Sequence, residues 1–322
     1  MNKRNIKSIL NKKINDIVES ITDEEVKEVF KHKIIITGGA LVSLLQGEKP
    51  NDYDIYFKDF ESCNKVVEYY IGKFNENHNV KAEIKYVSSY YDPARDVNKH
   101  DVKWISLDKA REEVTVGGNP LIKIFIKSDG VAGDNEEDEE ELFEMSQTNI
   151  DEDTDIEKEL SKEEKYVPKF LTSNAISLSG KIQLIIRFYG EPDKIHENYD
   201  FVHCKNYWTS WENKVVTNAE SLEAIINKEL IYVGSKYPLC SIIRTRKFIK
   251  RGWTINAGQY VKMALQLNEM DLGNVEVLEE QLTGVDSAYF SMMIDKIKEA
   301  KGDEDLKRID SSYVISILNK MF

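Results

Sequence analysis

The order of apolar and polar positions predicts a chain that alternates helices and strands in its first two thirds. Apolar residues recur at helical spacing among Lys, Asn and Asp over residues 5–31, which predicts a helix. A fresh helix start is expected at Thr22, because a capping residue is followed there by acidic side chains. Further strands are predicted at 34–37, 80–88, 101–107 and 121–127, and further helices at 40–46 and 60–75.

The pattern changes after residue 166. Residues 167–189 predict a strand, a tight turn at Ser179–Gly180 and a second strand, followed by a short helix at 192–198. Residues 199–208 predict one more strand with aromatic flanks. From there on the pattern is mainly helical, with helices expected at 221–230, 239–251, 257–268 and 275–282 and two more up to residue 322.

This order of elements predicts an α+β protein with two domains. The first, over 1–215, would contain a mixed sheet, and the second, over 216–322, would be all-helical. A chain of 322 residues is long enough for two modest cores.

Charge is concentrated in one segment. Residues 129–164 hold 17 acidic and 2 basic side chains, whereas the whole chain has a net charge of −13. The rest of the chain is therefore close to neutral, and a nucleic-acid substrate is not excluded. Like charges at this density do not pack, so the segment 129–165 is expected to be a flexible acidic insertion. A nucleic-acid mimic or an autoinhibitory arm is the alternative.

Cysteine use and hydropathy indicate a reducing, cytoplasmic setting. The cysteines are Cys63, Cys204 and Cys240, and their wide spacing fits neither a metal site nor a disulfide framework. No apolar run is long enough to span a bilayer, and the N-terminus lacks the apolar core of a signal peptide.

The segment 34–57 carries the most informative motif. An apolar run ends at Gly38 and Gly39, an apolar segment follows, and Asp52 and Asp54 then appear among strand-forming residues. In a strand the two carboxylates would share one face and repel each other unless a cation lies between them. The glycines would let backbone N–H groups approach a phosphate at the start of a helix.

This combination resembles the signature of the nucleotidyltransferase superfamily related to DNA polymerase beta, although Thr37 replaces the usual apolar residue before the glycines. The resemblance implies two Mg²⁺ ions held by Asp52 and Asp54, and a nucleoside triphosphate whose phosphates contact Gly38, Gly39 and Ser43. An ordinary turn followed by a strand with two solvated aspartates is the alternative.

The resemblance also implies a third carboxylate on a neighbouring strand. Asp200, in Tyr-Asp-Phe-Val, fits that description best, and Asp101 and Glu83 are rivals with similar flanks. The alternative role for Asp200 is to pair with a nearby cation. His196 and His203 flank that strand, and we interpret both as structural or supporting residues rather than as catalytic bases.

Two later segments resemble motifs of tRNA nucleotidyltransferases and bacterial poly(A) polymerases. The segment 170–175 is similar to their Asp-Phe-Thr-Ile-Asn-Ala, and 238–255 is similar to the neck motif that ends in Gly-Phe-x-Ile. This likeness implies nucleotide-binding roles for Asn174, Arg244 and Lys247, and an RNA or tRNA acceptor. The chain departs from the family in lacking the Arg-Arg-Asp before the first motif, and the neck match needs small offsets, so tRNA specificity does not follow.

Arg187 is a further candidate for triphosphate binding, because it lies on a predicted strand near the motif. Its surroundings, Arg-Phe-Tyr-Gly-Glu-Pro, together with the segment 195–203, resemble nucleotidyltransferase-like proteins encoded by bacteriophages.

The sequence thus predicts a template-independent transferase. It would move a nucleoside monophosphate from a nucleoside triphosphate to a hydroxyl acceptor, with Asp52, Asp54 and Asp200 as the two-metal cage. Three alternatives stay open: a related enzyme that modifies a small molecule or protein, a catalytically silent binding protein with the same fold, and a structural, virion-associated protein.

Overall fold

The computed structural model of the chain describes residues 2–78, 81–89, 103–127 and 165–272, together with residues 274, 277 and 281. The chain forms two compact units. The first consists of Met1–Tyr91, Lys103–Glu197 and His203–Ile225, and the second of Asp92–Val102, Asn198–Val202 and Ile226–Phe322.

The first unit opens with two helices, in the segment where the sequence pattern predicts helix over 5–31 with a fresh start at Thr22. α1 runs over Lys3–Ser20 and α2 over Glu24–His32. The chain is extended at Ile21, and Asp23, rather than Thr22, caps α2 by accepting hydrogen bonds from Glu25 N and Val26 N. The predicted helix start is therefore confirmed with its cap one residue later, and the helix is interrupted at residues 21–23, because a capping carboxylate satisfies the free N–H groups of a new helix.

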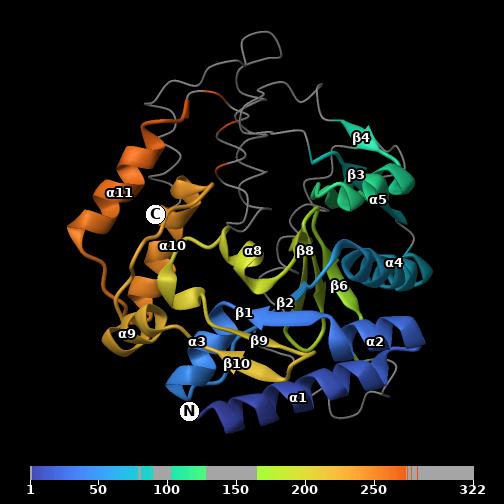
Figure 1. The fold of residues 1–322 in the computed structure, drawn as a ribbon, viewed down its shortest axis with the longest axis horizontal. Helices are drawn as coiled ribbons and strands as arrows, with labels where there is room; N and C mark the ends of the chain where they lie inside the picture. Colours follow the sequence, from blue (N-terminus) through green and yellow to red (C-terminus); the bar gives the residue numbers. More distant parts are fainter. Residues whose placement is uncertain are drawn as a thin grey trace. The chain divides into compact units, whose positions relative to one another are not determined.

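A seven-stranded mixed sheet forms the centre of this unit (Figure 1), and its strands occur in the order β10-β9-β1-β2-β8-β7-β6. The β2/β8 pair is parallel and the other pairs are antiparallel. The prediction of an α+β protein with a mixed sheet is confirmed. The strand bounds are Ile34–Thr37 (β1), Tyr53–Phe57 (β2), Pro168–Leu171 (β6), Ala175–Leu178 (β7), Ile182–Tyr189 (β8), Tyr207–Thr209 (β9) and Lys214–Val216 (β10).

A smaller sheet of three strands, in the order β4-β3-β5, completes the β-structure of the described residues. β3 covers Lys81–Val87, β4 covers Trp104–Ile105 and β5 covers Leu121–Lys127. The strand predicted at 101–107 is thus confirmed only at its centre, since the helix α5 (Leu107–Thr115) begins directly after it.

Helices cover one face of the large sheet, and the main apolar core lies there. α1, α2 and α4 (Phe60–Asn77) contribute apolar side chains to this core, as do alternate residues of the strands. On β2 and β8, Ile55, Leu184 and Ile186 are fully buried on this side. Because successive strand residues point to opposite faces, their neighbours face the other side of the sheet.

Two short helices connect to this sheet. α3 covers Gly39–Gln46 between β1 and β2, and α8 covers Pro192–His196 after β8. Both agree with the sequence-based predictions apart from their ends. The segment 167–189 contains three strands rather than two, because an additional turn at Thr172–Asn174 separates β6 from β7.

The predicted strand over 199–208 is wrong. Only Tyr207–Thr209 forms a strand, and Val202–Cys204 is a 3-10 helix. Asp200 lies in a bend, and Phe201 makes an isolated bridge to Tyr232. The aromatic residues that suggest a strand are buried by tertiary contacts instead.

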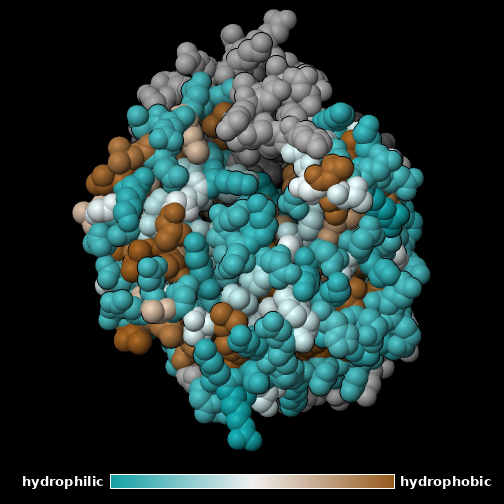
Figure 2. Space-filling model, in the orientation of Figure 1, coloured by the Kyte–Doolittle hydropathy of each residue, from teal (hydrophilic) through white to brown (hydrophobic). Residues whose placement is uncertain are grey.

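The described part of the second unit is mainly helical, with α10 over Pro238–Lys250 and α11 over Ala257–Leu267. α9 (Ala219–Asn227) precedes them, and all three helices match the prediction within two or three residues. Phe248 of α10 makes aromatic contacts with Phe201 and Trp253, which lie outside these helices. α11 exposes Val261 and Leu265, and Figure 2 shows apolar surface over this helix.

The acidic insertion predicted at 129–165 lies outside the described residues apart from Lys165, and so do the helices predicted beyond residue 282. The domain boundary at 215/216 stays a prediction. In the described part of the chain, no helix combines the length and the apolar character that crossing a membrane requires.

Candidate active site

The glycine pair forms the turn between β1 and α3. Gly38 adopts φ +72° and ψ −141°, a conformation that L side chains rarely adopt. Its N–H donates to the carbonyl of Cys204 at 3.2 Å, so this amide is used inside the protein. Gly39 is exposed, and a Cβ added there would meet nothing within 4 Å. The turn is therefore open at Gly39, where the first turn of α3 presents N–H groups that have no partner within the helix.

Ser43 lies one turn after Gly39 on the same face of α3 and is half-buried. Its carbonyl accepts a hydrogen bond from Glu48 N at 2.8 Å, close to the end of the helix. The residues predicted to contact phosphate thus comprise the exposed Gly39, the half-buried Ser43 and the buried Gly38, which shapes the turn.

The two aspartates lie at the start of β2. Asp52 directly precedes the strand, Asp54 is its second residue, and both are half-buried. Asp54 is paired with Gln183 of β8 in the parallel register. The β1/β2 register, continued by one residue, places Thr37 opposite Asp54 on the other side. Thr37, Asp54 and Gln183 therefore form a polar row on the sheet face opposite the main core.

No acidic residue occurs in either strand beside β2. β1 reads Ile-Ile-Ile-Thr, and β8 reads Ile-Gln-Leu-Ile-Ile-Arg-Phe-Tyr. Within the described ranges, no group of three or more His, Cys, Asp and Glu side chains is placed to hold one metal ion. The oxygen donors at this place are the carboxylates of Asp52 and Asp54 and the amide of Gln183, a set that suits Mg²⁺ completed by substrate phosphates.

The three candidates for a third carboxylate lie elsewhere. Glu83 is in β3 of the smaller sheet, opposite Phe125, and Asp101 is outside the described residues. Asp200 belongs to the second unit, where its side chain is 8% exposed and makes an ion pair of 3.0 Å with Arg244. The structure thus brings together two residues that the sequence singles out separately. Their part in metal or nucleotide binding stays a prediction.

α10 presents the predicted cationic residues of the second unit. Arg244 and Lys247 are three positions apart on this helix, and the following residue, Phe248, contacts Phe201 and Trp253 with ring centroids 5.7 and 6.0 Å apart. The aromatic contacts hold the helix in place next to the Asp200 segment of the same unit. The nucleotide-binding role of Arg244 and Lys247 stays a prediction.

The Thr-x-Asn-Ala segment has a structural role that the motif does not reveal. Thr172 Oγ1 accepts hydrogen bonds from Asn174 N at 3.3 Å and Ala175 N at 2.9 Å, which shapes the turn between β6 and β7. Asn174 Oδ1 accepts from Lys123 Nζ of β5 at 2.7 Å. Lys123 has no motif around it, and its proximity to Asn174 arises only because β5 approaches this turn.

Arg187 lies where β8 changes its alternation. The N–H groups of Ile186 and Arg187 both approach the carbonyl of Asn174, at 3.0 and 3.3 Å, and the register of β8 against β2 shifts in the same region. This pattern is that of a β-bulge, which re-aims side chains near a site. Arg187 and Asn174 are therefore neighbours in the fold, and their nucleotide-binding roles stay a prediction.

Thr37 joins the polar row to a buried network. Its Oγ1 lies 2.8 Å from His196 Nε2, 2.9 Å from the carbonyl of Asn206 and 3.2 Å from that of Cys204. A hydroxyl has one hydrogen, so it can donate to a carbonyl and accept from an N–H of His196. The hydroxyl of Thr37, which stands where the superfamily motif has an apolar residue, thus links residues 204–206 to the end of β1.

His196 is held neutral by its surroundings. The residue is 7% exposed, and burial together with the charge of Lys205 lowers its pKa to about 4. Burial also lowers the pKa of His203 to about 3. Both side chains are uncharged at pH 7, and their interpretation as structural or supporting residues stays a prediction.

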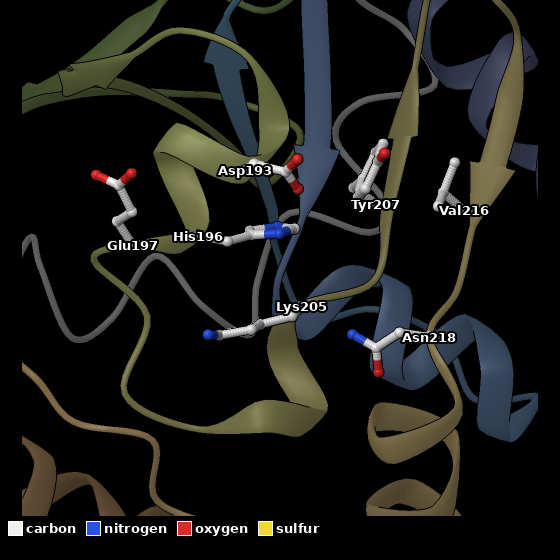
Figure 3. A pocket seen from close by; sticks show the side chains of 7 residues that line it. All are labelled: Asp193, His196, Glu197, Lys205, Tyr207, Val216 and Asn218. Carbon is white, nitrogen blue, oxygen red and sulfur yellow. The ribbon is translucent and has the colours of Figure 1, made fainter.

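A cavity of about 340 Å³ adjoins this network. It lies between α8, β9, β10 and the segment before α9, and Figure 3 shows its lining side chains. Sequence reasoning missed it, because its residues come from four segments with no shared motif. The lining residues are Asp193, His196, Glu197, Lys205, Tyr207, Val216 and Asn218.

Comparison with known proteins finds similarity to a phage protein and to two solved structures. A protein called Gabija anti-defense 2, from Bacillus phage SPbetaL7, is 22% identical over 128 residues, which cover 39% of this chain and 31% of that protein. The Thermotoga maritima CCA-adding enzyme in complex with tRNA aligns with a TM-score of 0.35 and 12% identity, over 88% of this chain and 54% of that one. An apo CCA-adding enzyme aligns with a TM-score of 0.33 and 12% identity, over the same shares. The chain thus spans about half the length of these solved structures and about a third of the phage relative.

The family model described as Gabija anti-defense 2 family protein matches residues 8–228. That range contains the glycine turn, both aspartates, the sheet and the cavity, and it is more than half of the chain. The chain therefore belongs to the Gabija anti-defense 2 family.

Proposed function

We propose that this protein is a Mg²⁺-dependent nucleotidyltransferase with a polymerase beta-like catalytic unit. The observation that carries the proposal is the position of Asp54 between Thr37 and Gln183, directly beside the open glycine turn at the end of β1. A pair of carboxylates next to exposed helix N–H groups is the arrangement that binds a metal-complexed triphosphate.

The reaction would be the transfer of a nucleoside monophosphate. An acceptor hydroxyl oxygen attacks the α-phosphorus, the bond from that phosphorus to the bridging oxygen breaks, and pyrophosphate leaves with the electron pair. The hydroxyl proton passes to solvent. Asp52 and Asp54 would hold Mg²⁺, which lowers the pKa of the attacking hydroxyl and neutralises developing charge when it is bound. Gly39 and Ser43 would bind the terminal phosphates.

Residues beyond this row would complete the nucleotide site. Asn174 and Arg187 are neighbours in the first unit, and Arg187 supplies a guanidinium suited to phosphate oxygens. For Asp200 a metal-binding role, and for Arg244 and Lys247 a nucleotide-binding role, are proposed from the motif resemblance alone. An RNA 3′ end, including that of a tRNA, is the acceptor proposed first.

The family description suggests a biological setting for the proposed activity. The matching family is described as anti-defense, so we propose that nucleotide transfer serves to inhibit the Gabija defence of the host. Co-expression of the wild-type protein with that defence should then restore phage growth, and Asp52→Ala should not.

The direct test is incorporation of labelled nucleotide. Purified protein is incubated with Mg²⁺ and each labelled NTP, with and without a tRNA and total-RNA pool. Incorporation by the wild type that is lost in Asp54→Ala supports the proposal. Asp59→Asn is the matched control, because Asp59 caps α4 and asparagine caps equally well. Retained transfer by a folded Asp52→Ala/Asp54→Ala variant would falsify the mechanism.

A non-catalytic nucleotide-binding protein is the second candidate. The observation in its favour is that Gln183 stands opposite Asp54 and neither strand beside β2 supplies a third carboxylate. The same assay separates the two: saturable NTP binding without incorporation, into any acceptor tried, favours the binding protein.

A further inference from the structure

The cavity beside α8 lies on the same face of the sheet as Asp54. Tyr207, which lines the cavity, is the register partner of Thr37, and Thr37 stands opposite Asp54 on β1. Neighbouring strands are about 4.8 Å apart, so two strand spacings, about 10 Å, separate Tyr207 from Asp54. A ligand with one end at the aspartates can therefore have its other end in the cavity.

The size of the cavity suits a nucleoside. Its volume of about 340 Å³ falls within the range of small-molecule sites, about 300–1,000 Å³. Tyr207 offers an aromatic ring and Val216 an apolar side chain, both from the sheet. Figure 3 shows Asp193 and His196 of α8 directed to the side on which Tyr207 lies, whereas the end groups of Glu197 and Lys205 are directed away from Tyr207. Side chains of this kind accommodate a flat aromatic ring that carries polar groups on its edge.

The hydrogen-bonding groups of the cavity have defined roles. Asn218 Oδ1 accepts from Ser221 N at 2.6 Å as the cap of α9, so what Asn218 offers a ligand is its amide N–H. His196 Nε2 is occupied by Thr37 at 2.8 Å. Asp193 contributes a carboxylate, which accepts hydrogen bonds only. A matching ligand must donate to Asp193 and accept from Asn218.

Charge decides which part of a nucleotide fits. The charged groups of the lining are two carboxylates, Asp193 and Glu197, and one ammonium group, Lys205. His196 carries no charge at pH 7. A cavity with this balance repels phosphate groups and leaves them at the open turn of Gly39. The uncharged base of a nucleotide carries no such penalty.

We propose that this cavity binds the base of the nucleoside triphosphate and selects a base that carries an exocyclic amino group, as adenine, guanine and cytosine do. The inference rests on the proposed transferase function and adds its nucleotide preference. Asp193 accepts from the exocyclic amino group, Asn218 donates to an acceptor on the ring edge, and Tyr207 packs against the ring face. Uracil has no exocyclic amino group and is disfavoured.

The test is binding of non-hydrolysable α,β-methylene analogues of ATP, GTP and UTP, measured by titration calorimetry with Mg²⁺. We expect the wild type to bind a purine analogue at least about tenfold more tightly than the UTP analogue, because a hydrogen bond to a charged group is lost with uracil. Asp193→Asn should reduce that ratio to about threefold or less.

Asn218→Asp is the second variant, and it should reduce the ratio as well. It removes the donor but keeps an oxygen that caps α9. Glu223→Gln is the matched control, since Glu223 is an exposed carboxylate of α9 that does not line the cavity, and it should keep the wild-type ratio. Thermal unfolding of each variant confirms that it is folded.

The possible results separate this inference from the function on which it rests. Analogue binding with a ratio that Asp193→Asn and Asn218→Asp both leave unchanged overturns the base pocket while the transferase proposal stands. Equal binding of all three analogues by the wild type also overturns the pocket. Failure of the folded wild type to bind any analogue overturns both.

Discussion

The two faces of the seven-stranded sheet use the same strands in different ways. One face carries Ile36, Ile55 and Leu184, which are fully buried in the main core. The opposite face carries Thr37, Asp54 and Gln183, which are their direct sequence neighbours. Each polar residue of the row is thus held by a buried residue beside it. If the strand register shifted by one residue, the apolar residues would lie on the polar face and the polar residues in the core. The apolar core that stabilises the fold therefore also positions the polar row.

The polar face itself contains two kinds of groups. Thr37 and His196 are buried and bonded to one another, so they hold the structure together. Asp52 and Gln183 are half-buried at the same face. Substitutions in the half-buried group should therefore affect catalysis, whereas substitutions of Thr37 or His196 should affect stability.

The largest effect should come from the carboxylates. Asp54→Asn keeps the shape of the side chain and removes its charge, so Mg²⁺-dependent incorporation should fall by at least about a hundredfold. Its free energy of unfolding should change by less than about 0.5 kcal/mol, because the residue is outside the core. Urea denaturation and the incorporation assay measure both. A loss of stability as large as that of a core variant would contradict the division between the two faces.

The opposite face should show the reverse behaviour. Ile55→Ala leaves a cavity at a fully buried position and should cost about 2–5 kcal/mol of unfolding free energy, as read from urea denaturation. Gln183→Ala, on the polar face of the next strand, is the matched comparison and should cost less than about 1 kcal/mol. Equal losses in the two variants would show that the polar face carries as much of the stability as the core.

Acid should destabilise the network around His196. Burial lowers the pKa of this side chain from its ordinary value of 6.5 to about 4 in the folded protein, so the unfolded chain binds more protons between these limits. This contribution to stability is fully present above pH 6.5 and is lost as the pH falls to about 4, a change of about 3 kcal/mol at 1.36 kcal/mol per pH unit. The measurement is unfolding free energy at pH 7 and pH 4.

His196→Gln is the comparison for that experiment. It removes the titrating group, so the fall in stability between pH 7 and pH 4 should be smaller than in the wild type by about that amount. The same fall in both proteins would assign acid sensitivity to other groups, such as carboxylates.

The smallest effect should come from Thr37→Val, which keeps the volume and removes the hydroxyl. Asn206 and His196 would each lose a buried partner, at a cost of about 1–3 kcal/mol in urea denaturation. Thr22→Val serves as control, since Thr22 is exposed, and should change stability by less than about 0.5 kcal/mol. If both variants behave alike, the Thr37 network does not stabilise the fold.

Local patterns predict most of the elements that carry the row. The apolar run 34–37, the glycine turn and the short helix after it follow from local residue preferences, and the structure has all three. Residues 53–57 likewise form a strand that includes Asp54. These segments are predictable because the apolar residues that each one packs into the core are close together in the sequence.

The prediction fails where aromatic residues are buried outside a sheet. Phe201 and Trp208 lie in a segment that looks like one strand, but Phe201 packs against Tyr232 and Phe248 instead. As a result Asp200 is in a bend and is paired with Arg244 rather than placed on a strand. Period-two alternation cannot distinguish a buried strand from a loop whose side chains are buried by another segment.

The sequence by itself determines the class of this protein, its glycine turn and the strand that holds Asp54, because these depend on residue preferences and alternation over a few positions. Only the tertiary structure decides that Gln183 stands beside Asp54, that Thr37 bonds to His196 and that seven residues from four segments enclose one cavity. Strand order and register bring these residues together from distant parts of the chain, as in the Thr37–His196 contact, where the separation is 159 positions. No local pattern encodes such a contact, because its free energy is gained only when the whole sheet has formed.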